Sequence, residues 1–172
     1  MHKVMTKYEQ SYLYHFTDKR NIEGIKKRGG LFSFNELEDI KTDEIFWGGN
    51  DWSHDADKMN GVDDYIHLCF IRNHPMEYQA RQEGRIQETF WILVHKDVLH
   101  IKGVRYTNDV SNKAGVMLLT NKQAVEELDH EAIFTFIDFG IAGNLQRKQI
   151  AEKYEILIPR HVPLKYLMNI DD

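Results

Sequence analysis

Hydrophobic and polar positions alternate in several short segments of the chain, which is typical of β-strands. Strands are predicted over residues 12–17, 64–71, 89–95 and 154–158, with a further short strand within 98–108. In the second segment, Ile66, Leu68 and Phe70 alternate with Tyr65, His67 and Cys69, so the two sets are expected on opposite faces of a sheet. Segment 89–95 is apolar almost throughout, which predicts a strand that is buried on both faces.

Helical signals lie between these strands. Ile22 and Ile25 are three positions apart, cations fill the next turn and Gly29-Gly30 can form a left-handed cap, so a helix is predicted over residues 20–28. Pro75 opens a helix to about residue 82, Asn121 is expected to cap a helix that runs to residue 128, and Pro163 starts a short final helix. Residues 131–139 fit either helix or strand. Residues 33–63 are predicted to form a long, mostly irregular loop.

The order of these elements decides the fold class. Regular alternation of strand and helix is missing, which argues against a doubly wound parallel sheet. We therefore predict an α+β fold with a mostly antiparallel sheet. A length of 172 residues fits one domain, and no linker or repeat divides the chain, so residues 1–172 are predicted to be a single domain.

Composition and charge narrow the class of protein further. With 42% hydrophobic and 28% charged residues, the chain is not a disordered or low-complexity segment. A net charge of -5 excludes a uniformly basic nucleic-acid-binding surface but leaves room for a local basic patch. No run reaches the roughly 18 apolar residues of a membrane span, and residues 1–10 lack a signal-peptide core, so a cytoplasmic protein is expected.

The common nucleotide-binding and hydrolase motifs are absent from the sequence, among them the P-loop, GxGxxG, GxSxG and HExxH. An acidic cluster of Asp51, His54, Asp55 and Asp57 offers metal ligands, but its spacing matches no known loop, so no metal is expected. The one cysteine, Cys69, lies in the middle of a predicted strand. A buried structural role is therefore expected for it rather than a nucleophilic one.

Glu155 is the residue that fits its local pattern least. In a strand it shares a face with Leu157, where apolar side chains are expected. A carboxylate in that position must be paired or must line a cleft, because an unpaired buried charge is costly. Two interpretations remain open: a structural salt bridge, or a cleft carboxylate that orients a sugar hydroxyl or accepts a proton.

His15 and the basic residues also allow a structural and a functional interpretation. His15 stands in an apolar strand with Thr17 on the same face, so it is either a hydrogen-bonded core residue or a ligand contact. A basic patch precedes Glu155 and could meet phosphates or simply face solvent; it consists of Arg147, Lys148 and Lys153. Three aromatic residues could anchor the long loop, cover a ligand or stack on bases; they are Phe46, Trp47 and Trp52.

Three blocks of the sequence, taken together, resemble the DarT-type ADP-ribosyltransferases, bacterial toxins that modify nucleic acid, typically single-stranded DNA. The first is Tyr14-His15-Phe16-Thr17-Asp18 with Arg20-Asn21, Gly29-Gly30-Leu31 and Ser33. The second is Asp64-Tyr65-Ile66-His67-Leu68 with Pro75-Met76. The third is Gln149, Tyr154-Glu155-Ile156-Leu157-Ile158-Pro159 and Val162-Pro163-Leu164. The resemblance spans residues 12–170 and implies a split β-sheet with NAD in the cleft between two small sheets.

The resemblance also implies roles for individual residues. Glu155 would be the catalytic carboxylate, and His15 and Thr17 would contact the adenosine-side ribose of NAD. The NAD pocket would further be shaped by Asn21, Gly30 and Leu31, with Tyr65 near the nicotinamide. His54 falls where many relatives carry an arginine that can meet the NAD diphosphate, and it would take that place in the catalytic site, with Lys58 as a nearby cation.

The activity implied by the resemblance is transfer of ADP-ribose from NAD to a base of single-stranded nucleic acid, without a metal. DNA is the expected acceptor and RNA the alternative, and Arg147, Lys148 and Lys153 would meet the strand. A toxin of this type would act with an antitoxin, in the family an ADP-ribosyl hydrolase of the macrodomain type. Protein ADP-ribosylation and a non-catalytic module that binds NAD or nucleic acid remain open as alternatives.

Overall fold

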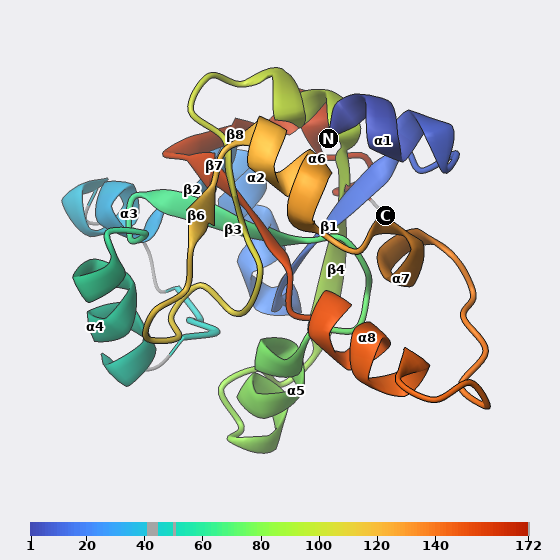
Figure 1. Ribbon diagram of the computed structural model, residues 1–172. Helices are drawn as coiled ribbons and strands as arrows, with labels where there is room; N and C mark the ends of the chain where they lie inside the picture. The colour runs from blue at the N-terminus through green and yellow to red at the C-terminus, as the bar shows by residue number, and fades with distance from the viewer. Residues whose placement is uncertain (41–44, 50, 172) are drawn as a thin grey trace.

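The computed structural model describes residues 1–40, 45–49 and 51–171, without the side chains of residues 39–40 and 51–53. Six strands form one antiparallel sheet in the order β4-β1-β3-β7-β5-β6 (Figure 1). They are β1 (Tyr12–Asp18), β3 (Tyr65–Cys69), β4 (Thr89–His95), β5 (Arg105–Thr107), β6 (Leu118–Leu119) and β7 (Glu155–Pro159). A second sheet pairs β2 (Gly30–Phe32) with β8 (His161–Pro163). The predicted α+β fold with a mostly antiparallel sheet is therefore confirmed.

Short helices surround the sheets (Figure 1). They are α1 (His2–Lys7), α2 (Ile22–Arg28), α3 (Phe34–Ile40), α4 (Asp51–Asn60), α5 (Pro75–Gln82), α6 (Asn121–Glu127), α7 (His130–Phe134) and α8 (Asn144–Ala151), with 3₁₀ turns at Lys19–Asn21, Lys96–His100 and Leu164–Tyr166. Gly29 ends α2 in the left-handed conformation, as predicted. The cap of α6 is Thr120 rather than Asn121, because Thr120 and Gln123 form a reciprocal capping box.

Two further sequence predictions are wrong. Residues 33–63 are not mostly irregular, since they contain α3 and α4. The start of α3 carries a helix signal, Ser33-Phe34-Asn35-Glu36, in which the Ser33 hydroxyl accepts a hydrogen bond from the Glu36 backbone N–H. Strand β4 is not buried on both faces: it lies at the edge of the sheet, Ile92 and Val94 on one face are fully buried, and the alternate positions are only partly covered.

The split between β1 and β3 creates the space for a site. These two strands record one pair in their register, Tyr14 opposite Cys69, whereas β1 and β4 pair along seven positions and β3 and β7 along five. Beyond Tyr14 the strands diverge. The backbone carbonyl of His67 is bonded there by a side chain instead of by β1 backbone, because Nδ1 of His15 donates to its oxygen at 2.9 Å. The core lies around the central strands, with Leu13, Leu68 and Ile156 fully buried.

Gly30 marks the closest approach of the two strands in the small sheet. Its φ is 145°, and a Cβ at this position would lie 2.1 Å from the carbonyl oxygen of Val162. Gly30→Ala is therefore expected to lower the free energy of unfolding by about 2 kcal/mol, because it adds both backbone strain and a steric clash. For a chain of this length that corresponds to a fall in Tm of roughly 4–8 °C.

Gly61→Ala is the matched control, measured beside Gly30→Ala by thermal and urea denaturation. Gly61 also has a positive φ, 67°, but none of the atoms that the structure describes lies within 4 Å of its added Cβ. We expect it to cost only the left-handed backbone penalty of about 1 kcal/mol. Equal losses in the two variants would show that the approach of Gly30 to Val162 adds nothing to stability.

Candidate functional site

A pocket opens where β1 and β3 diverge, and it is closed on its other sides by α3, α4, residues 45–49 and β2. All residues that the sequence assigned to catalysis or to NAD binding line this pocket; they are His15, Thr17, Asn21, Gly30, Leu31, His54, Tyr65 and Glu155. They come from separate elements and extend along the chain from position 15 to position 155. Their individual roles stay predictions, but the structure brings them to one place.

Glu155 is the first residue of β7 and is almost completely buried, at 4% exposure. Its Oε2 accepts hydrogen bonds from Nδ1 of His67 at 3.2 Å and from the backbone N–H of Ser111 at 3.3 Å. Nε2 of His74 lies 3.3 Å from Oε1. Burial alone would raise the pKa of Glu155, but the contacts with His67, His74 and Ser111 outweigh it, so that the pKa is lowered and the carboxylate is ionised.

Sequence reasoning missed three residues of this site: His67, His74 and Ser111. His67 had a signal, because it shares the alternating set of Tyr65 and Cys69 on β3, and Cys69 pairs with Glu155 in the sheet. Ser111 and His74 had none, since each reaches Glu155 from a loop whose path the sequence does not predict. Cys69 is buried as expected, and burial raises the pKa of its thiol, with a further contribution from Glu155.

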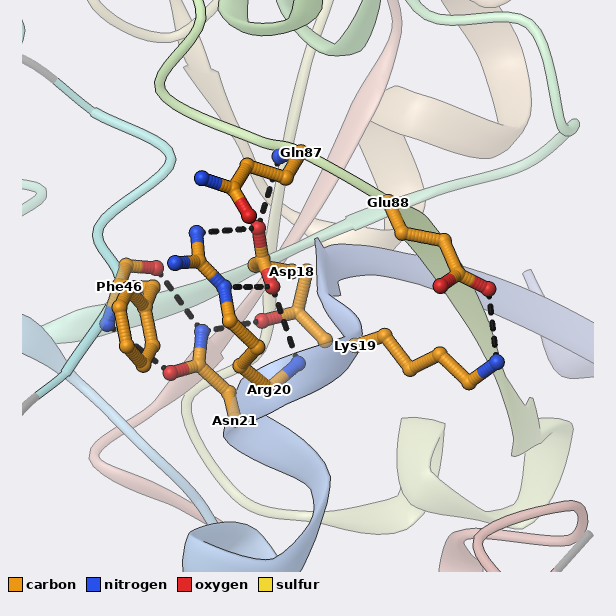
Figure 2. A network of polar contacts seen from close by, with 8 residues as sticks. Asp18, Lys19, Arg20, Asn21, Phe46, Gln87 and Glu88 are labelled. Atoms are coloured by element: carbon orange, nitrogen blue, oxygen red, sulfur yellow. Dashed lines mark hydrogen bonds and ion pairs between the residues drawn. The ribbon is translucent and has the colours of Figure 1, made fainter.

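The side-chain amide of Asn21 holds one wall of the pocket in place. Its Oδ1 accepts the backbone N–H of Phe46 at 3.0 Å, and its Nδ2 donates to the Phe46 carbonyl at 2.8 Å and to Oγ1 of Thr17 at 2.9 Å. Figure 2 shows both contacts between Asn21 and Phe46. Asn21 and Thr17 thus shape the pocket by fixing residues 45–49 to the end of β1.

Arg20 supports the same wall from outside (Figure 2). Its guanidinium lies over the Phe46 ring, 3.6 Å from the centroid, and forms two parallel bonds of 2.8 Å to the carboxylate of Asp18. Asp18 is buried, and it also accepts the backbone N–H groups of Arg20 at 2.9 Å and Gln87 at 2.8 Å. Asp18 thus caps the 3₁₀ turn Lys19–Asn21 and also holds Arg20 and Gln87 in place.

His54 lies on α4 in an aromatic group. Its ring stacks on Phe34 with centroids 4.1 Å apart and meets the edge of Trp47 at 5.5 Å. Phe46 and Trp47 both line the pocket, so the loop aromatic residues anchor this wall and face the pocket at once. The side chains of Trp52 and Asp51 lie outside the described residues.

The predicted basic patch does not line this pocket. Arg147 is on α8, where its guanidinium pairs with Asp129 at 2.7 Å and with Glu131 at 2.7 Å. Lys148 donates to the carbonyl oxygen of Ala132 at 2.9 Å, which ties α8 to α7. In Figure 1, α7 and α8 lie on the right, whereas α3 and α4 lie on the left. A contact of Arg147, Lys148 or Lys153 with nucleic acid stays a prediction.

Solved structures of related proteins share this fold. DarT of Thermus sp. 2.9 in complex with ADP-ribosylated ssDNA is 18% identical, with a TM-score of 0.64, over 92% of this chain and 79% of that chain. The same protein in complex with NAD+ is 17% identical, with a TM-score of 0.60, over 91% and 79%. DarTG of Thermosipho africanus in complex with ADP-ribose is 14% identical, with a TM-score of 0.63, over 91% of this chain and 42% of that longer chain.

The structures share the fold, and a sequence profile that covers most of the chain places it among the ADP-ribosyltransferases, enzymes that take ADP-ribose from NAD. The sequence profile described as "ssDNA thymidine ADP-ribosyltransferase, DarT" matches residues 14–171, so the chain belongs to the DarT family. A comparison with curated proteins gave no match. None of the described helices has the length and apolar character needed to cross a bilayer.

Proposed function

We propose that this protein transfers ADP-ribose from NAD to thymidine in single-stranded DNA, with Glu155 as the catalytic carboxylate. The observation that carries the proposal is the buried, ionised Glu155 that lines the cleft, in a chain of the DarT family. A salt bridge that served only stability would not need a cleft lined by so many other predicted NAD contacts. Of the two interpretations that the sequence left open, the cleft carboxylate is therefore favoured.

The chemistry follows from where charge develops. The bond between C1′ of the ribose and the nicotinamide nitrogen breaks, its electron pair leaves with nicotinamide, and positive charge builds on the sugar. An anionic Glu155 stabilises this charge. In thymidine, N3 carries the ring's one N–H, because N1 holds the deoxyribose. When N3 bonds to C1′, its proton has to leave, and we assign its acceptance to Glu155, a carboxylate that lines the cleft.

A single-stranded acceptor fits this chemistry. In a duplex, N3 of thymine donates to the partner base, so the nucleotide must be unpaired and unstacked before N3 can attack. The complex of Thermus sp. 2.9 DarT with ADP-ribosylated ssDNA supports the same acceptor here. His15, Thr17, Asn21, Gly30, Leu31, His54 and Tyr65 would bind NAD from the surrounding walls.

The test is incubation of the purified protein with labelled NAD and four oligonucleotides of equal length. They are a single-stranded DNA with one thymine, the same single strand without thymine, the thymine-containing strand in a duplex with its complement, and a single-stranded RNA. We expect an added ADP-ribose mass only on the thymine-containing single strand, and none with Glu155→Gln. Label on RNA alone, or on a protein acceptor alone, would overturn the proposed acceptor. NAD that binds but stays intact would favour a non-catalytic module.

We also propose that the activity is that of a toxin in a toxin–antitoxin or anti-phage system, acting in the cytoplasm and countered by an antitoxin that removes ADP-ribose. The longer DarTG chain of Thermosipho africanus, bound to ADP-ribose, supports such a pairing. Induced expression in a bacterial host should arrest growth, and co-expression of an ADP-ribosyl hydrolase of the macrodomain type should restore it. Normal growth with the active enzyme would contradict the toxin role.

A further inference from the structure

His67 is placed so that both of its ring nitrogens face hydrogen-bond acceptors. Nδ1 lies 3.2 Å from Oε2 of Glu155 and 2.9 Å from the hydroxyl oxygen of Ser111. The other side of the ring makes a hydrogen bond to the backbone of Val62. A carboxylate oxygen cannot donate, so the approach of Oε2 requires a proton on Nδ1, and the Ser111 hydroxyl, which can donate or accept, adapts to it. With the second ring proton directed at the backbone of Val62, the ring is an imidazolium.

The groups around His67 support the same charge state. Burial disfavours the imidazolium, but the hydrogen bond and charge of Glu155 and the charge of Asp57 outweigh it and raise the pKa of His67 to about 9. The other histidines that face this group, His15 on β1 and His74 ahead of α5, are different, because burial lowers the pKa of each. His67 is thus the cation of the cluster.

We propose that His67 is a positioning residue for ADP-ribosyl transfer, which fixes the Glu155 carboxylate through Oε2 and keeps it ionised in the closed cleft. This inference rests on the proposed function, since it assigns the catalytic role to Glu155. The two side chains come from neighbouring strands, and His67 is diagonal to Glu155 in the register that pairs Cys69 with Glu155. The sheet itself therefore sets their separation.

The need for such a residue follows from burial. Glu155 has little contact with water, and a substrate that fills the cleft removes what remains. A carboxylate without a cationic partner would take up a proton under those conditions and lose its effect on the ribose. Asp57 keeps the cluster anionic: burial raises its pKa to about 6, so at neutral pH the group holds two carboxylates and one imidazolium.

The first test measures the pair directly and needs no activity. Histidine ring signals are followed by NMR from pH 5 to pH 10 in the wild type and in Glu155→Gln, with His67→Gln to assign the resonance. We expect His67 to titrate near pH 9 in the wild type and at a clearly lower pH in Glu155→Gln, because only the charge of Asp57 and the backbone of Val62 then oppose the effect of burial. An unchanged titration, or a neutral ring throughout, would overturn the proposal.

The second test measures catalysis in His67→Gln and His67→Leu. We expect kcat to fall by about 10²-fold while the KM for NAD changes by less than about threefold, since the carboxylate acts mainly in the transition state. The acid limb of the kcat profile should move to higher pH in both variants, because the pKa of Glu155 rises when the cationic His67 is removed. An acid limb identical to the wild type would contradict the positioning role.

His95→Gln serves as the matched control, because His95 lies at the outer end of the edge strand β4 and contacts Asp97, outside the pocket. It should leave kcat and the pH profile unchanged. Circular dichroism and Tm establish that the His67 variants are folded. If the wild type transfers nothing to DNA, the proposed function fails, yet the NMR titration of Glu155→Gln still decides whether His67 and Glu155 form an ion pair.

Discussion

Glu155→Gln is expected to reduce the rate of ADP-ribosyl transfer by about 10³-fold while leaving NAD binding nearly intact. The amide has the shape of the carboxylate but carries no charge and accepts no proton. It therefore loses both the stabilisation of the ribose cation and general-base assistance, each of which contributes on the order of 10²-fold or more. The measurement is the initial rate of label transfer to the thymine-containing single strand, with NAD affinity measured separately by calorimetry.

The substitution should be tolerated by the fold. The amide oxygen of the substituted side chain can still accept the Ser111 backbone N–H, and His67 can give up one proton once the carboxylate is gone. Glu127→Gln, which changes an exposed carboxylate on α6, is the control for the same chemical change and should keep the wild-type rate. Transfer by Glu155→Gln at more than about a tenth of the wild-type rate would contradict a catalytic role for this carboxylate.

The parts of the site that the sequence predicted are those with a strong local signal. Alternation along β3 and β7 identified their faces, and the carboxylate on the face of Leu157 stood out because apolar residues surround it. The partners of Glu155 could not be predicted in the same way. His67 and Ser111 are 88 and 44 positions away from it, and register between distant strands is set by tertiary packing rather than by local pattern.

The wrong predictions have related causes. Helix α4 is polar along most of its length, so it lacks the apolar stripe by which a surface helix is recognised. The sequence of β4 resembles that of a strand buried on both faces because its less buried face also carries apolar side chains. On that face Trp91 packs edge-on against Phe16 and Tyr14 of the neighbouring strand β1. The nucleic-acid contact of Arg147 is not among the wrong predictions and stays a prediction, although Asp129 and Glu131 pair with its guanidinium in the fold.

Asp18 is the residue on which the pocket wall depends most. Its buried carboxylate accepts four hydrogen bonds, two from the guanidinium of Arg20 and two from backbone N–H groups (Figure 2). The side chain of Arg20 is itself 37% exposed, so it can recover part of its hydration if Asp18 is removed. The two backbone N–H groups are only partly exposed to water, and losing a charged acceptor costs each of them a strong bond.

Asp18→Ala is therefore expected to lower the free energy of unfolding by about 3 kcal/mol at pH 7, below the full cost of breaking a wholly buried pair. Glu88→Ala is the control, because the Lys19–Glu88 pair in the same figure is exposed on both sides and should contribute no more than about 0.5 kcal/mol. Urea denaturation of both variants beside the wild type measures the two losses. Equal losses would mean that burial of Asp18 adds nothing.

The pH dependence gives this prediction a second, independent test. The hydrogen bonds from Arg20, opposed in part by burial, hold the pKa of Asp18 below its ordinary value, so its stabilisation is complete above the unfolded pKa of about 3.9. It is lost as the pH falls through the lower pKa of the folded state. The difference between wild type and Asp18→Ala should thus stay constant from about pH 8 to pH 5 and shrink below about pH 4. A difference that persists undiminished in acid would assign the loss to packing rather than to the charge, and the wall of the pocket would then rest on the Asn21 amide.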